Sequence, residues 1–132
     1  MADSFNFELV SPERLLLSTA VSEVVIPGTD GEMTVMAHHA PTMTTIKPGV
    51  VTVVTADGKS DRFVVFGGFV DILPEGCTLL AESAVAVADI DRNDLSKRLQ
   101  DAREDVADAT NDAAKQKAQE YLDHLTTMEA AL

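Results

Sequence analysis

The sequence predicts an antiparallel β-sandwich or flattened barrel in residues 1–88 and an α-helical segment in residues 89–132. Three observations support this division. All seven glycines and all five prolines precede residue 89, and both residue types interrupt helices and shape turns. Before that point, short runs rich in Val, Ile, Thr and Phe alternate with turn sequences. After it, apolar residues recur with a helical period.

Three short turn sequences divide the first part into β-branched runs. They are residues 56–59, between the runs 50–55 and 62–66; residues 73–76, between the runs 69–73 and 77–81; and residues 27–31, between the runs 21–26 and 32–37. The first contains an Asp-Gly pair, which strongly indicates a hairpin between β-branched runs. Because these turns recur at short spacing with no helical period between them, we expect an antiparallel sheet structure.

Two apolar stripes run through the second part. They are Leu95, Leu99, Ala102, Val106, Ala109 and Ala113, and then Ala114, Ala118, Tyr121, Leu125, Met128 and Leu132. Each is the narrow seam by which helices pair. The stripes change register just after Thr110-Asn111-Asp112, which favour turns and caps. We therefore predict two antiparallel helices, with Asp91 as the first N-cap. One long helix remains an alternative, and the Ala-rich seam predicts a hairpin that detaches easily.

The composition excludes several classes of protein. The chain of 132 residues has 22 acidic and 10 basic residues, a formal charge of −12 at pH 7. Proteins that bind nucleic acid or anionic lipid need an excess of cations, so neither partner is expected. A single cysteine allows no intramolecular disulfide. With no long apolar run and no signal-peptide pattern, we expect a protein of a reducing compartment that does not insert into a membrane.

The histidines are the candidate metal-binding residues of this sequence. If His38 and His39 lie on a strand, their side chains point to opposite faces and cannot bind one metal ion together. His124 has no second ligand at helical spacing. We expect His38-His39 to be one surface or loop histidine beside one that is partly packed, with no metal site.

The remaining candidates also have structural interpretations. Cys77 follows a turn glycine and is expected to be a small buried apolar residue. Gly67-Gly68 predicts a bulge or a tight strand crossing where a Cβ would clash. The sequence has no phosphate-binding loop, dinucleotide fingerprint or nucleophile elbow. We therefore expect no catalytic residue and no cofactor.

Six ordered sequence blocks carry a family resemblance. They are Val10-Ser11-Pro12-Glu13, residues 26–33, His39-Ala40-Pro41, residues 46–50, residues 67–71, and Ala81-Glu82-Ser83-Ala84. Together, across residues 5–91, they closely resemble the epsilon-subunit family of bacterial F-type ATP synthases. The resemblance implies a sandwich of about ten strands in residues 1–88 and a C-terminal helical hairpin in residues 89–132.

The resemblance also implies a function and partners. Members of this family are non-catalytic rotor subunits of the central stalk, which link the gamma subunit to the membrane c-ring and couple proton flow to ATP synthesis. The family's c-ring contact corresponds to Asp30, Gly31, Glu32 and His39, and its gamma contact to Ser11, His39 and Thr44. The implied location is the cytoplasmic face of the bacterial inner membrane, as a peripheral subunit.

The hairpin departs from the family's nucleotide-binding motif. Some members bind ATP through an I/L-D-x-x-R-A motif, and the matching residues 90–95 have Asp94 at the Arg position and Leu95 at the Ala position. A carboxylate there repels a triphosphate. Inhibitory members bring basic hairpin residues to the catalytic alpha and beta subunits, whereas residues 89–132 have eleven acidic and six basic residues. This implies a weak or absent inhibitor.

Two other functions are kept as alternatives. The first is a nucleotide-sensing regulatory module whose hairpin closes over ATP, which equilibrium dialysis with ATP would distinguish from a coupling subunit. The second is an enzyme with a histidine site. The residues show no convergent triad or ligand set for it.

Overall fold

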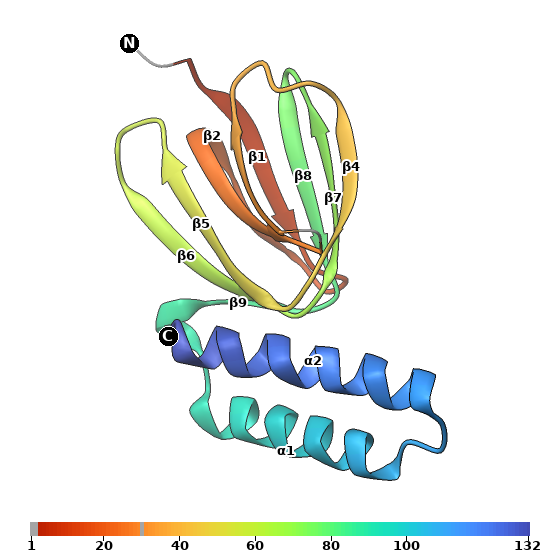
Figure 1. Ribbon diagram of the computed structural model, residues 1–132. Helices are drawn as coiled ribbons and strands as arrows, with labels where there is room; N and C mark the ends of the chain where they lie inside the picture. The colour runs from red at the N-terminus through yellow and green to blue at the C-terminus, as the bar shows by residue number, and fades with distance from the viewer. Residues whose placement is uncertain (1–2, 30) are drawn as a thin grey trace.

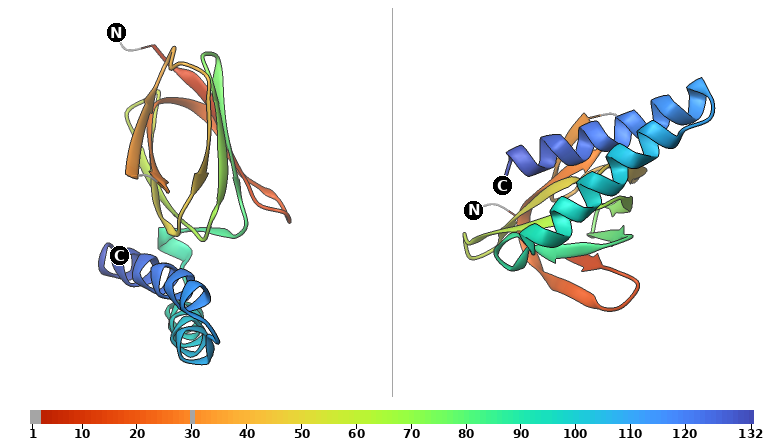
Figure 2. Two further views of the ribbon diagram at one scale, coloured as in Figure 1. Left: turned by 45° about the vertical axis from the view of Figure 1, so that its right-hand side comes forward. Right: turned by 90° about the horizontal axis from the view of Figure 1, so that it is seen from below.

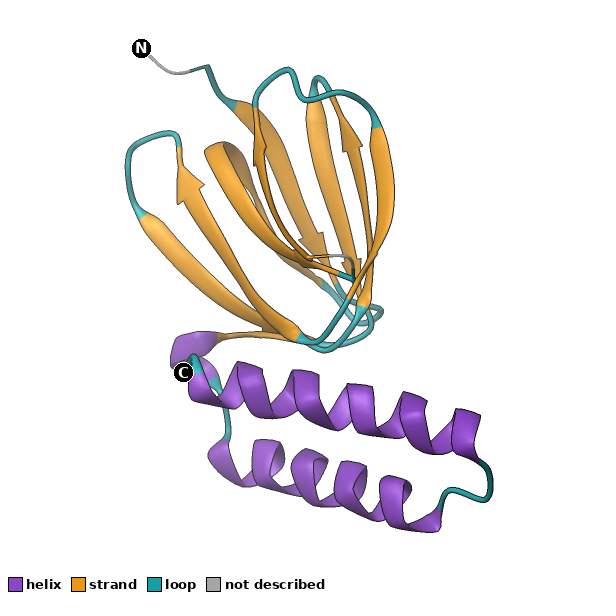
Figure 3. Ribbon diagram, viewed as in Figure 1, coloured by secondary structure: helices purple, strands orange, loops and turns teal. Residues whose placement is uncertain are grey.

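The computed structural model describes residues 3–29 and 31–132 and shows a β-sandwich with a helical hairpin across one end (Figure 1). The nine strands of the described residues are β1 (Phe5–Val10), β2 (Leu15–Gly28), β3 (Gly31–Met36), β4 (Thr42–Ile46), β5 (Gly49–Thr55), β6 (Ser60–Val65), β7 (Gly68–Leu73), β8 (Gly76–Ala81) and β9 (Ala84–Ala86). A short 3-10 turn, η1 (Val87–Asp89), leads to helices α1 (Arg92–Asp108) and α2 (Asp112–Ala130). All strands precede both helices in the chain, and Figure 3 shows the strands gathered in the sandwich and the two helices in the hairpin, which confirms the predicted fold class.

The longest strand, β2, belongs to both layers of the sandwich. Its first half pairs with β1, and its second half pairs with β3 on one side and β5 on the other. The register with β5 shifts between Val21 and Glu23, where a bulge lets the strand bend. One layer is β4-β7-β8-β1 with the first half of β2, and the other is β3, the second half of β2, β5, β6 and β9 (Figure 2). The family resemblance implied about ten strands, and the described chain has nine. The count is lower because β2 contributes to both layers but is one continuous strand.

One strand pair departs from the antiparallel arrangement that the hairpin turns predicted. β1 lies parallel to β8, with Phe7 beside Cys77 and Leu9 beside Leu79. Hairpin turns predict only the pairing of strands that follow each other in the chain, and parallel pairs need a long connection between them. The sandwich is therefore mixed, with one parallel pair inside an otherwise antiparallel layer.

The three predicted turns each connect an antiparallel pair. They join β2 to β3, β5 to β6 and β7 to β8. In the β5–β6 turn, Gly58 has a φ of 89°, which explains the Asp-Gly pair. The Thr55 hydroxyl and the Lys59 backbone N–H both donate to the Asp57 carboxylate and lower its pKa. These local bonds hold the turn, and the Ala56 backbone N–H ties it to β2 by donating to the Ala20 carbonyl at 3.0 Å.

Two separate apolar clusters hold the molecule together. The larger lies between the layers and draws all of its buried residues from β1 to β8. The smaller joins the sandwich to the hairpin and consists of Val64, Phe66, Leu95, Leu99, Ala102, Leu125 and Met128. Strand β6 and the residue after it contribute to both clusters, because Phe63 and Val65 point inward while Val64 and Phe66 point toward the helices.

The helical segment is a hairpin of two helices, so the alternative of one long helix was wrong. Asp91 caps α1 as predicted, since its Oδ1 accepts hydrogen bonds from the backbone N–H groups of Asn93 at 2.8 Å and Asp94 at 3.4 Å. Asn111 caps α2 by accepting from the Ala114 N–H at 2.8 Å. Polar residues with local capping bonds therefore produce the break that the change of register indicated.

The predicted stripes need two corrections. The first stripe ends at Val106, because Ala109 is already the C-cap of α1 and Ala113 lies in α2. In the second stripe, Tyr121 is 38% exposed, while Leu122, which lies outside the stripe, packs against the smaller cluster. The physical reason is that α2 contacts β5 as well as α1, which shifts its buried face by one residue.

We expect residues 1–88 to fold without the hairpin, because every residue of the larger cluster lies before residue 89. Deleting residues 89–132 should preserve cooperative thermal unfolding but expose Val64 and Phe66, at a cost of about 1.5 to 3 kcal/mol for each side chain. Circular dichroism and binding of an apolar dye to the truncated and full chains would measure both effects. Loss of cooperative unfolding after truncation would contradict this expectation.

Candidate subunit interface

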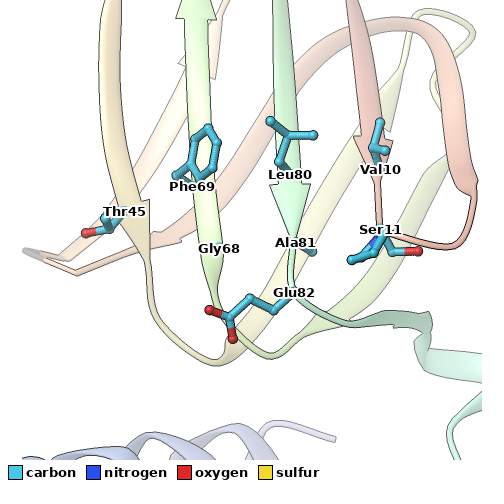
Figure 4. Close-up of a pocket in the computed structure, with 9 residues that line it drawn as sticks. Val10, Ser11, Thr45, Gly68, Phe69, Leu80, Ala81 and Glu82 are labelled. Carbon is cyan, nitrogen blue, oxygen red and sulfur yellow. The ribbon is translucent and has the colours of Figure 1, made fainter.

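The outward face of the layer β4-β7-β8-β1 carries an uncovered apolar row. Thr45 pairs with Phe69, Phe69 with Leu80, and Leu80 with Val10, so these four residues stand side by side across four strands (Figure 4). Phe69 is 42% exposed and Leu80 is 38% exposed. Val70 and Leu79, which neighbour them along the strands, point inward and are fully buried, as strand alternation requires. The row lines a shallow groove of about 710 Å³.

Further exposed apolar side chains extend this face. Met43 is 67% exposed and lies opposite Asp71, one row above Thr45 and Phe69. Leu15 is 55% exposed and pairs with Val10 at the lower end of β1. Large apolar patches on a folded surface are typical of contact sites for other proteins. We call the surface formed by Val10, Leu15, Met43, Phe69 and Leu80 the apolar face.

Glycine 68 makes the close packing at the lower end of the apolar face possible. A Cβ on Gly68 would lie 2.1 Å from the backbone oxygen of Leu80, and its φ is +134°. Gly67 also has a positive φ, of +110°. Only glycine fits at Gly68, because other residues would clash with the neighbouring strand and adopt a strained conformation. This confirms the predicted tight crossing, which sets Phe69 directly beside Leu80.

Acidic side chains border the apolar face. Glu82 lies just after β8 and beside Gly67. A Cβ added to Gly67 would lie 3.3 Å from the Oε2 of Glu82. Asp71 pairs with Thr78, and Thr78 pairs with Glu8 across the next row. The surface therefore combines an apolar centre with a negatively charged border. Such a surface is complementary to a partner with an apolar centre and basic residues around it.

Of the residues expected at the gamma contact, Ser11 lies beside the apolar face and Thr44 points away from it. Ser11 lines the groove directly after β1, and its backbone N–H donates to the Arg14 carbonyl at 2.9 Å. Thr44 pairs with Val70 and is half-buried on the inward side of β4, so Met43 and Thr45 point outward instead. Sequence reasoning missed Met43, Phe69 and Leu80. The alternation of inward and outward side chains along each strand could have identified these three residues as outward-facing. Only the pairing between strands shows that they form one face.

The turn expected at the c-ring contact is fastened to the end of β4. Gly31 pairs with Gly28 and has a φ of +136°, and Glu32 is exposed. The Thr29 hydroxyl and the Thr29 backbone N–H both donate to the Thr45 carbonyl, at 2.8 Å and 3.1 Å. Asp30 lies outside the described residues. The turn therefore projects from the same end of the sandwich as the groove.

The histidine pair lies in the turn after β3 and not on a strand, so the argument from strand alternation does not apply. His38 is exposed, has a φ of 64° and has its Nε2 3.0 Å from Asp3 Oδ2. His39 is half-buried, with its Nδ1 2.8 Å from the Ala40 carbonyl oxygen. His39 lies beyond the far end of β3 from Glu32, and the strand from Glu32 to Met36 alone spans roughly 13 Å. Within residues 3–29 and 31–132, no group of three or more His, Cys, Asp or Glu side chains gathers in a way that could hold a metal ion.

Cys77 is buried on the inward side of β8, as predicted. Burial raises its pKa to about 12, and the negative charge of Asp71 contributes to the increase. The thiol is therefore protonated at neutral pH and is not a nucleophile. None of the helices in the described chain is long and apolar enough to cross a membrane.

The role of Gly68 predicts a large difference between two glycine substitutions. Gly68→Ala should destabilise the fold by about 3 kcal/mol or more, because the clash with Leu80 adds to the strain of a positive φ. Gly58→Ala is the matched control, since its φ is +89° but no atom lies within 4 Å of the added Cβ, and it should cost about 1 kcal/mol. Urea unfolding of both variants would measure these free energies. Equal losses would show that the close approach at Gly68 is relaxed in solution.

Residues 4–87 match the family model described as ATP synthase, delta/epsilon chain, beta-sandwich domain. The chain is 68% identical over 132 residues to the ATP synthase epsilon chain of Mesorhizobium japonicum, covering 100% of this chain and 98% of that relative. It is 61% identical, with the same coverage, to the ATP synthase epsilon chain of Chelativorans sp..

Two solved structures have a similar fold. A chain of the Euglena gracilis mitochondrial ATP synthase, in an assembly of OSCP, F1 and c-ring, matches with a TM-score of 0.77 and 27% identity over 97% of this chain and 81% of that one. A chain of the Tetrahymena thermophila mitochondrial ATP synthase, from the central stalk and c-ring, matches with a TM-score of 0.69 and 15% identity over 96% of each chain. The second match shows similarity of fold alone.

Proposed function

The chain belongs to the epsilon-chain family of ATP synthases, and on that premise we propose that it is the non-catalytic central-stalk subunit that couples proton flow through the c-ring to ATP synthesis. The relatives at 61–68% identity cover the whole chain, hairpin included. The related Euglena chain comes from an assembly that contains F1 and the c-ring. The observation that carries the proposal is the apolar face, which leaves large side chains uncovered on a rigid sheet.

The gamma subunit is the proposed occupant of the apolar face. A sheet face can transmit torque because its residues are held by ladders of hydrogen bonds and cannot move separately. Phe69 and Leu80 form the centre of this contact, and Ser11 lies beside them in the groove. Thr44 and His39 belong to the same margin of the layer, along β4 and the loop before it. The acidic border favours basic residues on gamma around the contact.

The β2–β3 turn is the proposed contact with the c-ring. Gly31 and Glu32 lie at its tip and present an exposed carboxylate to a polar loop, together with Asp30 as the sequence indicates. The bonds from Thr29 to Thr45 tie this turn to β4, so force at the turn reaches the apolar face through one strand. His39 takes part in this contact only if the contact runs along the whole of β3.

We place the protein at the cytoplasmic face of the bacterial inner membrane, as a peripheral subunit. The bacterial relatives at 61–68% identity support this location. A pull-down of the tagged full chain from bacterial membranes tests the function as a whole. Recovery of gamma, the c-ring and the catalytic subunits is expected, and their absence from a stable, folded bait would contradict the proposal.

Substitutions on the apolar face should weaken gamma binding selectively. Leu80→Ser and Met43→Ser remove apolar contact area, and each should lower the affinity for purified gamma by about tenfold or more. Met36→Ser is the matched control, because Met36 is 56% exposed but lies on β3 in the other layer. Titration calorimetry with each full-length variant would measure the affinities. The assignment fails if Met36→Ser is as damaging as Met43→Ser.

The helical hairpin is proposed to be a weak or absent inhibitor of ATP hydrolysis. Its eleven acidic residues oppose docking on an acidic segment of the catalytic alpha and beta subunits. Asp94, at the family's Arg position, places a carboxylate where it repels a triphosphate, and it pairs with Arg98 at 3.7 Å, so the guanidinium beside it already has an anionic partner. This pairing supports the coupling role over a nucleotide-sensing module, and equilibrium dialysis with ATP should detect little binding.

The same charge balance predicts how truncation affects hydrolysis. ATPase activity of the purified catalytic head should change by less than about twofold when the full chain is replaced by residues 1–88, at both low and moderate salt, because charge repulsion opposes docking at each. Mixing each form with the same head preparation and measuring phosphate release would check this. A several-fold rise on truncation, strongest at low salt, would show that basic residues of α1 do dock on the head.

A further inference from the structure

Arg98, in the middle of α1, contacts two separate segments of the sandwich. Its Cζ lies 3.9 Å from the centroid of the Phe66 ring, directly after β6. Its Nη2 donates to the Ser83 hydroxyl at 3.3 Å, directly before β9. Its Nε lies 3.7 Å from Asp94 Oδ2, one turn earlier on the same helix. One guanidinium therefore joins α1 to the two chain segments that border the smaller apolar cluster.

The other contacts of this joint give little directional preference. Val64, Phe66 and the helix residues around them are apolar, and burial of apolar area does not depend on orientation. The seam between the helices includes small residues such as Ala102. A planar guanidinium stacked on an aromatic ring requires one geometry, and it is stronger where water is excluded. Phe66 is only 6% exposed, so the ring lies within the joint.

Undocking of the hairpin would break some contacts of Arg98 and keep others. The pairing with Asp94 lies within α1 and persists in either state. The contacts with Phe66 and Ser83 exist only when the hairpin lies against the sandwich. A group can shift an equilibrium only through contacts that differ between its two states. A second such contact lies elsewhere in the joint, where Arg62 Nη2 donates to the Ala131 carbonyl at 2.9 Å.

We propose that Arg98 is a positioning residue that holds the helical hairpin on the sandwich. Its guanidinium is stacked on Phe66 and bonded to Ser83, and Asp94 keeps it directed toward them. Loss of these contacts opens the joint without unfolding the sandwich, because the larger apolar cluster contains no helix residue. The position of the hairpin therefore depends on Arg98 within a largely apolar joint, with the Arg62 contact to Ala131 at its other end.

Amide hydrogen exchange of the full chain, followed by mass spectrometry, tests this role. Arg98→Gln should accelerate exchange in residues 92–130 by about tenfold, while β1, β7 and β8 change by less than about twofold. Arg103→Gln is the matched control, since it removes the same charge from an exposed position on α1, and it should leave exchange within about twofold. Arg98→Lys keeps a charge near Asp94 but lacks the planar group, and it should restore less than half of the protection.

A double-substitution cycle separates stacking from general packing. Phe66→Leu should accelerate hairpin exchange in the natural sequence by clearly more than in the Arg98→Gln background, because the stacking contact is already absent there. Additive effects of the two substitutions would overturn the stacking contact. Equal effects of Arg98→Gln and Arg103→Gln, full protection in Arg98→Lys, or faster exchange throughout the sandwich would each overturn the proposed role of Arg98.

Discussion

Strand β6 is buried on both faces, and the positions of the two layers and of the hairpin follow from this burial. Consecutive residues of a strand point to opposite faces, so the run from Phe63 to Phe66 can be buried only if both faces are covered. The opposite layer covers Phe63 and Val65, and the hairpin covers Val64 and Phe66. This strand therefore joins two parts of the chain that have separate apolar clusters. It also determines where the hairpin lies, against the layer that contains β5 and β6.

The hairpin covers one end of the layer that contains β5 and β6, and the other layer keeps an exposed outer face. There, the alternation that buries Val70 and Leu79 leaves Phe69 and Leu80 toward solvent. The close approach at Gly68 holds their strands together at the lower end of this face. Exposed apolar side chains in this position are typical of a subunit of a larger assembly. The family to which the chain belongs is part of such an assembly, the ATP synthase. In the proposed assembly, the gamma subunit covers this face.

Basic and acidic side chains have different places in this molecule. The chain has few basic residues, and two of them, Arg62 and Arg98, form contacts between the sandwich and the hairpin. These cations are used within the chain, while acidic residues dominate the outer surface of the helices. Asp94 fits this arrangement, because it pairs with Arg98 and places a carboxylate at the position that corresponds to the arginine in the nucleotide-binding motif of some family members. The hairpin is thus held by contacts within the chain.

The features that depend on neighbouring residues could be predicted from the amino-acid sequence. The loss of Gly and Pro near residue 89, the turn at Gly58, the cap at Asp91 and the buried Cys77 could all be predicted, because turns, caps and periodicity arise within a few residues. Long-range strand pairing sets two other features, namely that β2 serves both layers and that β1 lies parallel to β8. Long-range contacts also place Phe69 and Leu80 on one face and stack Arg98 on Phe66. Periodicity shows which residues share a side of their own element, but these contacts join residues far apart in the chain, and only the pairing and packing of whole elements bring them together.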